Sequence, residues 1–218
     1  MARYGDHPDS KFVVFEGIDG CGKSTQVSRT VEALISQGHK VTLIDSRNQD
    51  DIVNALYKIV TSKSYTDMLG VTEAFIFNAI RHHLVEKYIR PALKEPGYII
   101  CDRFTWSTIA YQGAQNGGEG QKVRDICNLA TGYLEPHHTI YLDISVEESI
   151  WRTANDGPQD KFECDKSLLE RTLDTYRDLI MLRHDGSISV ISGTLDRDSI
   201  TNLILDAIKI TPKETEDR

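Results

Sequence analysis

Short apolar runs recur along this chain between longer stretches of mixed polarity. Five such runs have the length and composition of strands buried on both faces of a sheet. They cover residues 12–15, 41–44, 98–101, 139–142 and 188–191. Turn formers precede several of them, including Pro96-Gly97 before the third run and Pro136 before the fourth. The pattern therefore predicts five strands.

Between these runs, apolar residues recur at spacings of three and four, which is typical of helices with one buried face. Such stretches lie at 27–35, which ends near Gly38, and at 74–93, 169–180 and 200–208. Alternation of strand and helix predicts an α/β protein with a parallel five-stranded sheet, helices on both faces and ligands at the carboxyl ends of the strands.

Composition narrows the class of protein. A chain of 218 residues suits one domain, residues 1–218, and we expect polar, frayed tails at 1–10 and 211–218. A net charge of −8 argues against general binding to nucleic acid or anionic membranes, and no apolar run is long enough to cross a membrane. The four cysteines lack CxxC spacing, so we expect neither a zinc site nor a redox pair, and a cytoplasmic location.

The strongest local signal is a phosphate-binding glycine loop. Residues 17–24 read GIDGCGKS, which matches GxxxxGK[ST] between a predicted strand and a predicted helix, as the motif requires. Backbone N–H groups and the helix N-terminus would bind phosphate oxygens, Lys23 would reach the β- and γ-phosphates, and Ser24 would bind Mg²⁺. The residues predicted to bind ATP are Gly17, Ile18, Asp19, Gly20, Cys21, Gly22, Lys23, Ser24 and Thr25.

A second candidate follows the third predicted strand. Asp102 and Arg103 fall at its carboxyl end, at the same sheet edge as the glycine loop. There a carboxylate can hold Mg²⁺ through water, and a guanidinium can bind phosphate oxygens with two N–H groups. A surface ion pair is the alternative interpretation of Asp102 and Arg103, and their position favours the functional one.

With these residues in view, the chain resembles thymidylate (dTMP) kinases over about residues 11–210. The resemblance rests on FEGIDGCGKSTQ at 15–26, the run from Phe77 to Leu93, DRFTWSTIAYQG at 102–113 and YLDIS at 141–145. The string DRxxxSxxAYQG is the most specific of these. It implies the three-layer P-loop kinase fold with a short lid at about 152–163, transfer of phosphate from Mg·ATP to dTMP, and a role in dTTP biosynthesis.

The resemblance also implies roles in binding the acceptor nucleotide. Phe77 would stack on the pyrimidine and Arg81 would donate to its exocyclic oxygen, as an aromatic ring and a guanidinium four residues apart on a helix can do. Tyr111 would crowd the 2′ position of the sugar. Asp19 would lie near the 3′-hydroxyl, with Glu16 just before the loop, and Ser107 and Gln112 would line the base pocket. Arg47 and Arg103 would hold phosphate. Arg152 would pack against the adenine of ATP. The loop 192–194 would lie near the base of ATP.

Two departures from the family bear on substrate and catalysis. The family's Arg-x-Pro after the second strand is replaced by Arg47-Asn48-Gln49, so an amide stands where a proline would line the 5-methyl group. We therefore keep dUMP or a 5-modified dUMP as an alternative acceptor. The lid retains Arg152 and has Lys161, with few other cations. This divergence would suit a viral enzyme, which would act in the host cytoplasm.

The predicted mechanism is direct in-line transfer of the γ-phosphoryl group, with Lys23, Asp102, Arg103 and Arg152 as catalytic residues and Ser24 and Asp102 holding Mg²⁺. A nucleotide-binding regulatory protein without kinase activity is the alternative from another class, since the lid is sparse. By resemblance we expect a homodimer, with the apolar stretch at 68–93 as its candidate interface.

Overall fold

The structure is a computed structural model that describes residues 6–115, 120–154, 165–183 and 185–209. Its elements follow one another in the predicted alternation. In chain order they are β1 (Ser10–Glu16), α1 (Lys23–Ser36), β2 (Val41–Asp45), α2 (Asp51–Thr61), α3 (Gly70–Leu84), the π-helical turn η1 (Val85–Ile89), α4 (Arg90–Leu93), β3 (Gly97–Asp102), α5 (Thr105–Ala114), α6 (Gly120–Thr131), β4 (His138–Asp143), α7 (Val146–Thr153), α8 (Lys166–Met181), β5 (Ile188–Ser192) and α9 (Arg197–Ile208).

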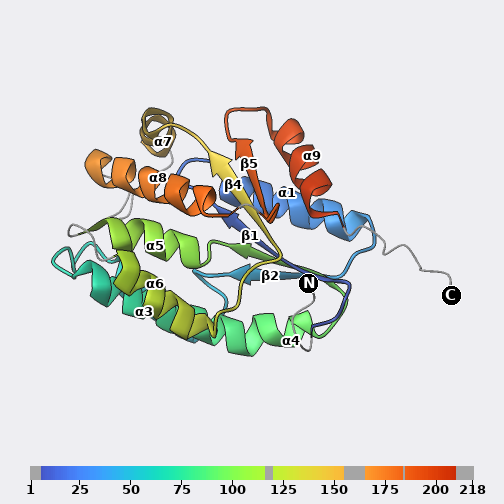
Figure 1. Cartoon of the computed structure of the whole chain (residues 1–218), viewed down its shortest axis with the longest axis horizontal. Helices are drawn as coiled ribbons and strands as arrows, with labels where there is room; N and C mark the ends of the chain where they lie inside the picture. Colours follow the sequence, from blue (N-terminus) through green and yellow to red (C-terminus); the bar gives the residue numbers. More distant parts are fainter. Residues whose placement is uncertain (1–5, 116–119, 155–164, 184, 210–218) are drawn as a thin grey trace.

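The five strands form one parallel sheet in the order β2-β3-β1-β4-β5 (Figure 1). All five predicted strands are present. At the carboxyl edge, Asp102 of β3 pairs in register with Phe15 of β1 and with Asp45 of β2. The segments that follow β1, β2 and β3 therefore begin side by side, and they include the glycine loop and Arg103.

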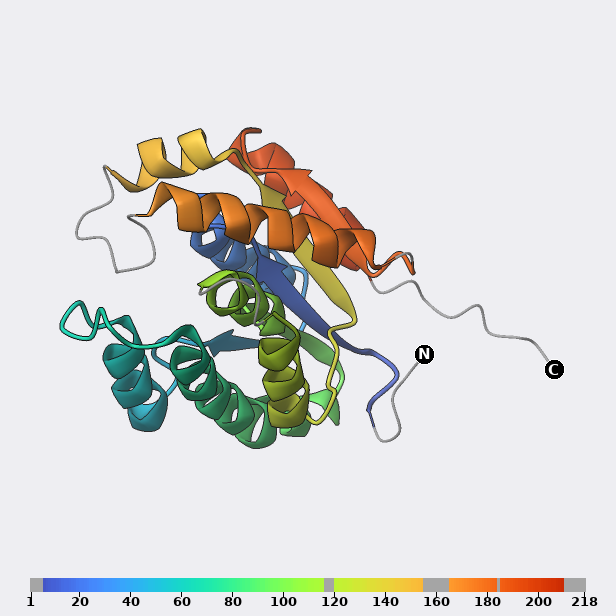
Figure 2. The same cartoon turned by 60° about the vertical axis from the view of Figure 1, so that its left-hand side comes forward.

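Alternate side chains of β1 enter two different parts of the core. Phe12 and Val14 pack in a cluster with Ile80 and Leu84 of α3, whereas Val13 and Phe15 pack in one that includes residues of α1, α5, α8 and α9. Helices α1 and α9 lie together beside the sheet, while α3, α5 and α6 form a second group (Figures 1 and 2). The predicted parallel sheet with helices on both faces is confirmed.

The predicted helix at 74–93 is interrupted. It is built from α3, the π-helical turn η1 and α4, with Pro91 in the first turn of α4. Proline has no N–H to continue the helical bonding, and its ring crowds the carbonyl four residues earlier. A wider turn just before Pro91 relieves that crowding, so the chain continues in one direction without a regular helix.

The N-terminal boundary differs from the expectation of a frayed tail through residue 10. Ser10 is buried as the first residue of β1, and the backbone N–H of His7 donates to the carbonyl of Leu93 at 2.8 Å. Polarity alone misplaced this boundary, because a strand at the centre of a sheet can begin with a buried serine. The predicted C-terminal tail, 211–218, lies outside the described residues. None of the described helices combines the length and the apolar character needed to cross a bilayer.

Candidate active site

The glycine loop between β1 and α1 has a backbone that few other residues could adopt. Gly17 has a φ of 141°, and a Cβ there would lie 2.6 Å from the carbonyl oxygen of Leu142. Gly22, directly before α1, has a φ of 95°. Side chains at these positions would be strained or would collide with β4. The motif therefore fixes a loop that wraps over the carboxyl end of β1.

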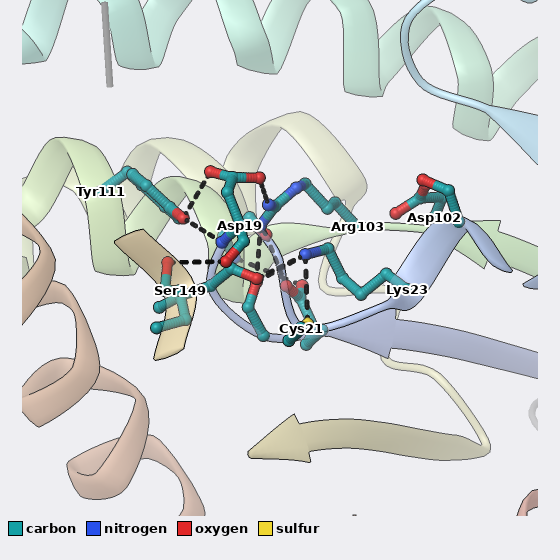
Figure 3. Close-up of polar contacts among 12 residues, drawn as sticks. Asp19, Cys21, Lys23, Asp102, Arg103, Tyr111 and Ser149 are labelled. Carbon is teal, nitrogen blue, oxygen red and sulfur yellow. Dashed lines mark hydrogen bonds and ion pairs between the residues drawn. The ribbon is translucent and has the colours of Figure 1, made fainter. Parts of the chain in front are cut away.

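Lys23 begins α1 and turns back over this loop (Figure 3). Its side chain is buried, and Nζ donates to the carbonyl oxygens of Gly17 at 3.0 Å and Ile18 at 2.9 Å. Both partners are neutral, so the ammonium charge is balanced only in part by these bonds. An anion at the loop would complete that balance.

Arg103 lies beside the loop on the other side, directly after β3. Its backbone has a φ of 70°, which is unusual for a residue with a side chain, and its N–H donates to the carbonyl of Phe15 at 2.9 Å. Nη1 donates to the Gly17 carbonyl at 2.9 Å and to Ser107 Oγ at 3.0 Å, while Nη2 pairs with the Asp19 carboxylate. Arg103 is thus held against the glycine loop.

Asp19 connects Arg103 to α5 (Figure 3). Tyr111 donates its hydroxyl hydrogen to Asp19 Oδ2 at 2.8 Å and accepts from the Asp19 backbone N–H at 3.2 Å. The guanidinium of Arg103 lies 5.3 Å from the centre of the Tyr111 ring. Burial raises the pKa of Asp19, but the charges of Arg103 and Lys23 and the hydrogen bonds from Tyr111 and Arg103 together outweigh it and lower that pKa below the ordinary value of 3.8. Asp19 is therefore ionised at neutral pH.

Glu16, the last residue of β1, supports this arrangement from beneath. Its buried carboxylate accepts from the backbone N–H groups of Phe104 at 2.8 Å and Ser107 at 3.2 Å, and from the hydroxyls of Ser107 and Tyr176. The first two bonds satisfy N–H groups at the start of α5. Glu16 therefore fixes the turn that carries Arg103, and it links this turn to α8 through Tyr176.

Asp102 has bonding capacity that the described residues do not use. Its Oδ2 accepts from Ser24 Oγ at 3.2 Å and from Arg47 Nη2 at 3.3 Å. Its Oδ1 is buried and has no hydrogen-bond partner among the described residues. A buried carboxylate oxygen of this kind favours a bound cation or an ordered water. Ser24 and Asp102 together thus fit Mg²⁺, which binds few protein oxygens and keeps waters and phosphates.

No group of three or more metal-ligating side chains occurs in the part of the chain that the structure describes. A metal held by Ser24 and Asp102 would therefore need further oxygens from phosphate and water. Mg²⁺ in phosphoryl-transfer enzymes commonly binds in this way.

A second group of predicted residues lies on α3 and α5. Arg81 is buried, and its guanidinium donates to Thr108 Oγ1 at 3.0 Å, to Asn78 Oδ1 at 3.2 Å and to the Phe104 carbonyl at 2.6 Å. These bonds hold the charged group at a fixed place in the wall. Phe77 lies one helical turn earlier, partly buried. A flat apolar surface and a cation are thus presented from one helix.

These two groups face one cavity of about 700 Å³. Among the predicted site residues, Gly17 and Ile18 of the glycine loop do not line it, and neither do Gln49, Ser192 and Thr194. The predicted residues that contribute to its wall are Asp19, Gly20, Cys21, Gly22, Lys23, Ser24, Thr25, Arg47, Phe77, Arg81, Asp102, Arg103, Ser107, Tyr111, Gln112 and Arg152. Cavities of this size hold small organic ligands.

Arg152 joins the glycine loop to the segment after β5. Nη1 donates to the carbonyls of Gly20 at 3.2 Å and Gly193 at 3.0 Å, and Nε pairs with Glu148 at 2.7 Å. Gly193 itself lines the cavity, as expected for the loop 192–194. Most of the predicted lid, including Lys161, lies outside the described residues.

The expectation for Gln49 is wrong. Its Oε1 accepts from the backbone N–H of Asp45 at 2.7 Å, and Gln49 is not among the described residues that line the cavity. The amide is therefore directed to its own loop and not toward a base. The family resemblance suggested a wall residue, but a long polar side chain can satisfy a nearby backbone group instead.

Several cavity residues were missed by the sequence analysis. Tyr57 and Thr61 come from α2, a helix that was not predicted, although Asp50 followed by apolar residues at 53, 56, 57 and 60 is a start signal for a helix. Thr108 was overlooked within the motif at 102–113. Trp151, exposed on α7, also lines the cavity. Tyr57, Thr61 and Trp151 carry no motif of their own, so only the fold places them at the cavity, whereas Thr108 lies within a motif that the sequence shows.

Comparisons with known proteins agree with this geometry. A family model described as thymidylate kinase matches residues 15–204. The thymidylate kinase of Roseiflexus castenholzii is 40% identical over 149 residues, which cover 68% of this chain and 65% of that protein. That of Bacillus licheniformis is 32% identical over 205 residues, covering 91% and 96%, and that of Nostoc punctiforme is 30% identical over 202 residues, covering 92% and 96%.

In the Roseiflexus match this chain spans slightly less than two thirds of the relative's length, whereas in the Bacillus and Nostoc matches it spans nearly the whole relative. The matched region contains the glycine loop, the motif at 102–113 and the helix with Phe77 and Arg81. The resemblance seen in the sequence is therefore confirmed, and the chain belongs to the thymidylate kinase family.

Proposed function

We propose that this protein transfers the γ-phosphoryl group of ATP to the 5′-phosphate of dTMP, giving dTDP and ADP. The observation that carries the proposal is the position of Arg103. Its guanidinium contacts the glycine loop through Gly17 and the acceptor motif through Ser107, within one cavity. A cation at this junction can neutralise charge on two phosphate groups that meet end to end.

The donor is held mainly by the backbone of residues 17–25. Successive N–H groups and the N-terminus of α1 bind the phosphates of ATP, and Lys23 exchanges its bonds to the carbonyls of Gly17 and Ile18 for bonds to phosphate oxygens. Arg152, anchored to Gly20 and Gly193, packs against the adenine side. Ser24 and Asp102 would hold Mg²⁺, which would supply charge neutralisation for the phosphates of ATP.

The acceptor is held by side chains. Phe77 stacks on the pyrimidine, Arg81 donates to its exocyclic oxygen, and Ser107 and Gln112 complete the base pocket. Tyr111 excludes a ribose 2′-hydroxyl. Asp19 lies near the 3′-hydroxyl, and Arg47, which pairs with Asp102 at 3.3 Å, orients the 5′-phosphate together with Arg103.

No catalytic base is required by this mechanism. A phosphate monoester has a second pKa of about 6, so the attacking group is already mostly dianionic at neutral pH. Catalysis then consists of alignment and charge neutralisation by Lys23 and Arg103. Glu16, which does not line the cavity formed by the described residues, keeps Arg103 aligned without touching the substrates.

We further propose that residues 1–218 act as one kinase domain, in the cytoplasm, with nucleotides rather than nucleic acid or membrane as partners. By family resemblance the active form is a homodimer. Phe75, which is exposed on α3, supports an interface on the face of that helix turned away from the cavity.

An acceptor panel tests the proposal. ADP release from Mg·ATP is measured with dTMP, dUMP, dCMP and AMP, and with no acceptor. We expect kcat/KM to be highest for dTMP, and ADP release without an acceptor to be negligible. A preference for dUMP would support the alternative acceptor, although the position of Gln49 removes the reason for it. If ATP binds tightly but none of the acceptors supports ADP release, the protein would instead be a regulatory nucleotide-binding protein.

A further inference from the structure

Asp50, which directly precedes α2, gathers an unusual number of hydrogen bonds. Its Oδ1 accepts from the backbone N–H of Val53 at 3.0 Å and so caps α2. Its Oδ2 lies 2.8 Å from Nε2 of His83, 2.9 Å from Nζ of Lys87 and 2.7 Å from the hydroxyl of Tyr88. One carboxylate therefore joins the start of α2 to the end of α3 and to the π-helical turn η1.

These contacts are more than a helix cap requires. A cap needs one acceptor for an N–H group of the first turn, and Oδ1 provides it. The three further partners are 33, 37 and 38 residues away in the sequence. The Asp50 side chain is 19% exposed, so the bonds are partly shielded from water. The backbone bond from Val53 and the bonds from His83, Lys87 and Tyr88 hold the pKa of Asp50 well below its usual range.

Helix α2 in turn forms part of the acceptor side of the cavity. Tyr57 and Thr61 line it, and the Tyr57 ring contacts the Phe77 ring edge-on, with 6.5 Å between ring centres. A shift of α2 relative to α3 would therefore move two wall residues and disturb the ring proposed to stack on the base.

The loop that precedes α2 carries Arg47. It contains no proline and is held by polar contacts instead: Gln49 Oε1 accepts from the Asp45 N–H at 2.7 Å, and Ser46 Oγ donates to the Asp102 carbonyl at 2.9 Å. The loop is thus fixed at β2 and β3 at one end. At the other end Asp50 is its attachment to α3.

We propose that Asp50 is a positioning residue for the acceptor nucleotide: by tying α2 to α3 and η1, it sets the place of Arg47 and of the wall formed by Tyr57 and Thr61. The inference rests on the proposed function. Asp50 does not line the cavity formed by the described residues, so it acts through these neighbours and not by touching the substrate. The hydrogen bonds of the Asp50 carboxylate join it to Val53, His83, Lys87 and Tyr88 and not to the glycine loop or Arg152, so the ATP side should be independent of it.

Three variants test this. Asp50→Ser keeps a good helix cap but is too short to reach His83, Lys87 and Tyr88. Tyr88→Phe removes one of the three bonds from the other side and leaves α2 and its cap unchanged. Asp51→Ser, at the exposed first residue of α2, is the matched control. For each variant, kcat, the KM for dTMP, the KM for ATP and the melting temperature are measured.

We expect Asp50→Ser to raise the KM for dTMP about five- to tenfold, and Tyr88→Phe about twofold, because the acceptor wall is less well ordered. The KM for ATP should stay within about twofold of the wild type, and Asp51→Ser should change neither constant. Should Asp50→Ser fail to fold, the double variant His83→Phe, Tyr88→Phe replaces it, since it removes two of the bonds without altering α2.

A lower melting temperature with an unchanged KM for dTMP would overturn the inference, because Asp50 would then be a structural cap only. An equal rise in both KM values would overturn it as well, since the effect would not be confined to the acceptor side. Failure of the proposed function is a different result: the wild-type protein itself would then show no turnover of dTMP.

Discussion

The half of the cavity around residues 17–25 is built mostly from backbone, whereas the half around α2 and α3 is built from side chains. In the first half, glycines at positive φ shape the loop, and Lys23 is held by carbonyl oxygens. In the second, Phe77, Arg81 and Tyr57 come from two helices that must be placed correctly against each other. The two halves meet at Arg103.

This difference explains how far the sequence could predict the site. A site built from backbone is encoded by a contiguous sequence motif, because the positive φ values at Gly17 and Gly22 favour glycine. The motif therefore identified the ATP side directly. On the acceptor side the family resemblance supplied Phe77 and Arg81. The contacts of Asp50 remained hidden, because their partners are more than 30 residues away.

The fold shows the same contrast. The five strands were predictable because they are short, mainly apolar runs between turn formers. Burial on both faces holds for β1, β3 and β4, but not for the edge strands, where Leu43 of β2 and Val190 of β5 are exposed. Helix α2 was missed although its apolar residues at 53, 56, 57 and 60 recur at helical spacing, because the start signal at Asp50 was not used. The π-helical turn η1 could not be read from periodicity, because helical spacing continues through it. Gln49 was assigned to the cavity by alignment with the family, yet its conformation depends on the Asp45 N–H.

Apart from Arg103 at the junction, the largest effect that tests the comparison should come from the backbone half. Lys23→Ala removes the one side-chain cation of the loop, and we expect kcat to fall by about 100-fold or more, as when a preorganised donor is lost. The KM for dTMP should change little. Lys58→Ala, exposed on α2, is the control. A kcat close to that of the wild type would show that the loop backbone suffices without Lys23.

The next effect concerns the junction of the two halves. Glu16→Gln replaces a buried carboxylate that accepts four hydrogen bonds by an amide that can accept at only one of its two ends. We expect the free energy of unfolding to fall by about 1–3 kcal/mol. We also expect a lower kcat, because the turn that carries Arg103 loosens. Denaturant unfolding and steady-state kinetics measure both. Tyr176→Phe, which removes one of the four donors, should show a smaller change in each, and an unaltered stability for Glu16→Gln would contradict this account.

The side-chain half should respond through binding. Phe77→Ala should raise the KM for dTMP by about 5- to 150-fold, the range expected when a base loses 1–3 kcal/mol of stacking on an aromatic ring. The KM for ATP should not change. Thr72→Ala, at an exposed position of the same helix, is the control. Equal effects of both substitutions would show that α3, and not the ring of Phe77, determines acceptor binding.

The smallest effect is expected at Gln49. Because its amide bonds to Asp45 and does not line the cavity, Gln49→Ala should leave the ratio of kcat/KM for dTMP to that for dUMP unchanged, even if a looser loop raises both KM values. The ratio is measured with the two acceptors in parallel. A shift of this ratio toward thymine would restore the idea of an amide in the base pocket.

The central claim is that Arg103 neutralises charge where the two phosphates meet, and a single-turnover measurement tests it most directly. ADP formation is followed after mixing saturating Mg·ATP and dTMP with Arg103→Ala, with Arg177→Ala at an exposed ion pair on α8 as the control. We predict that the rate falls by about 1,000-fold for Arg103→Ala, the lower end of the range for arginines in phosphoryl transfer, and is unchanged for Arg177→Ala. A rate within about threefold of the wild type, with both nucleotides bound, would contradict the account, since a cation at this junction should not be dispensable.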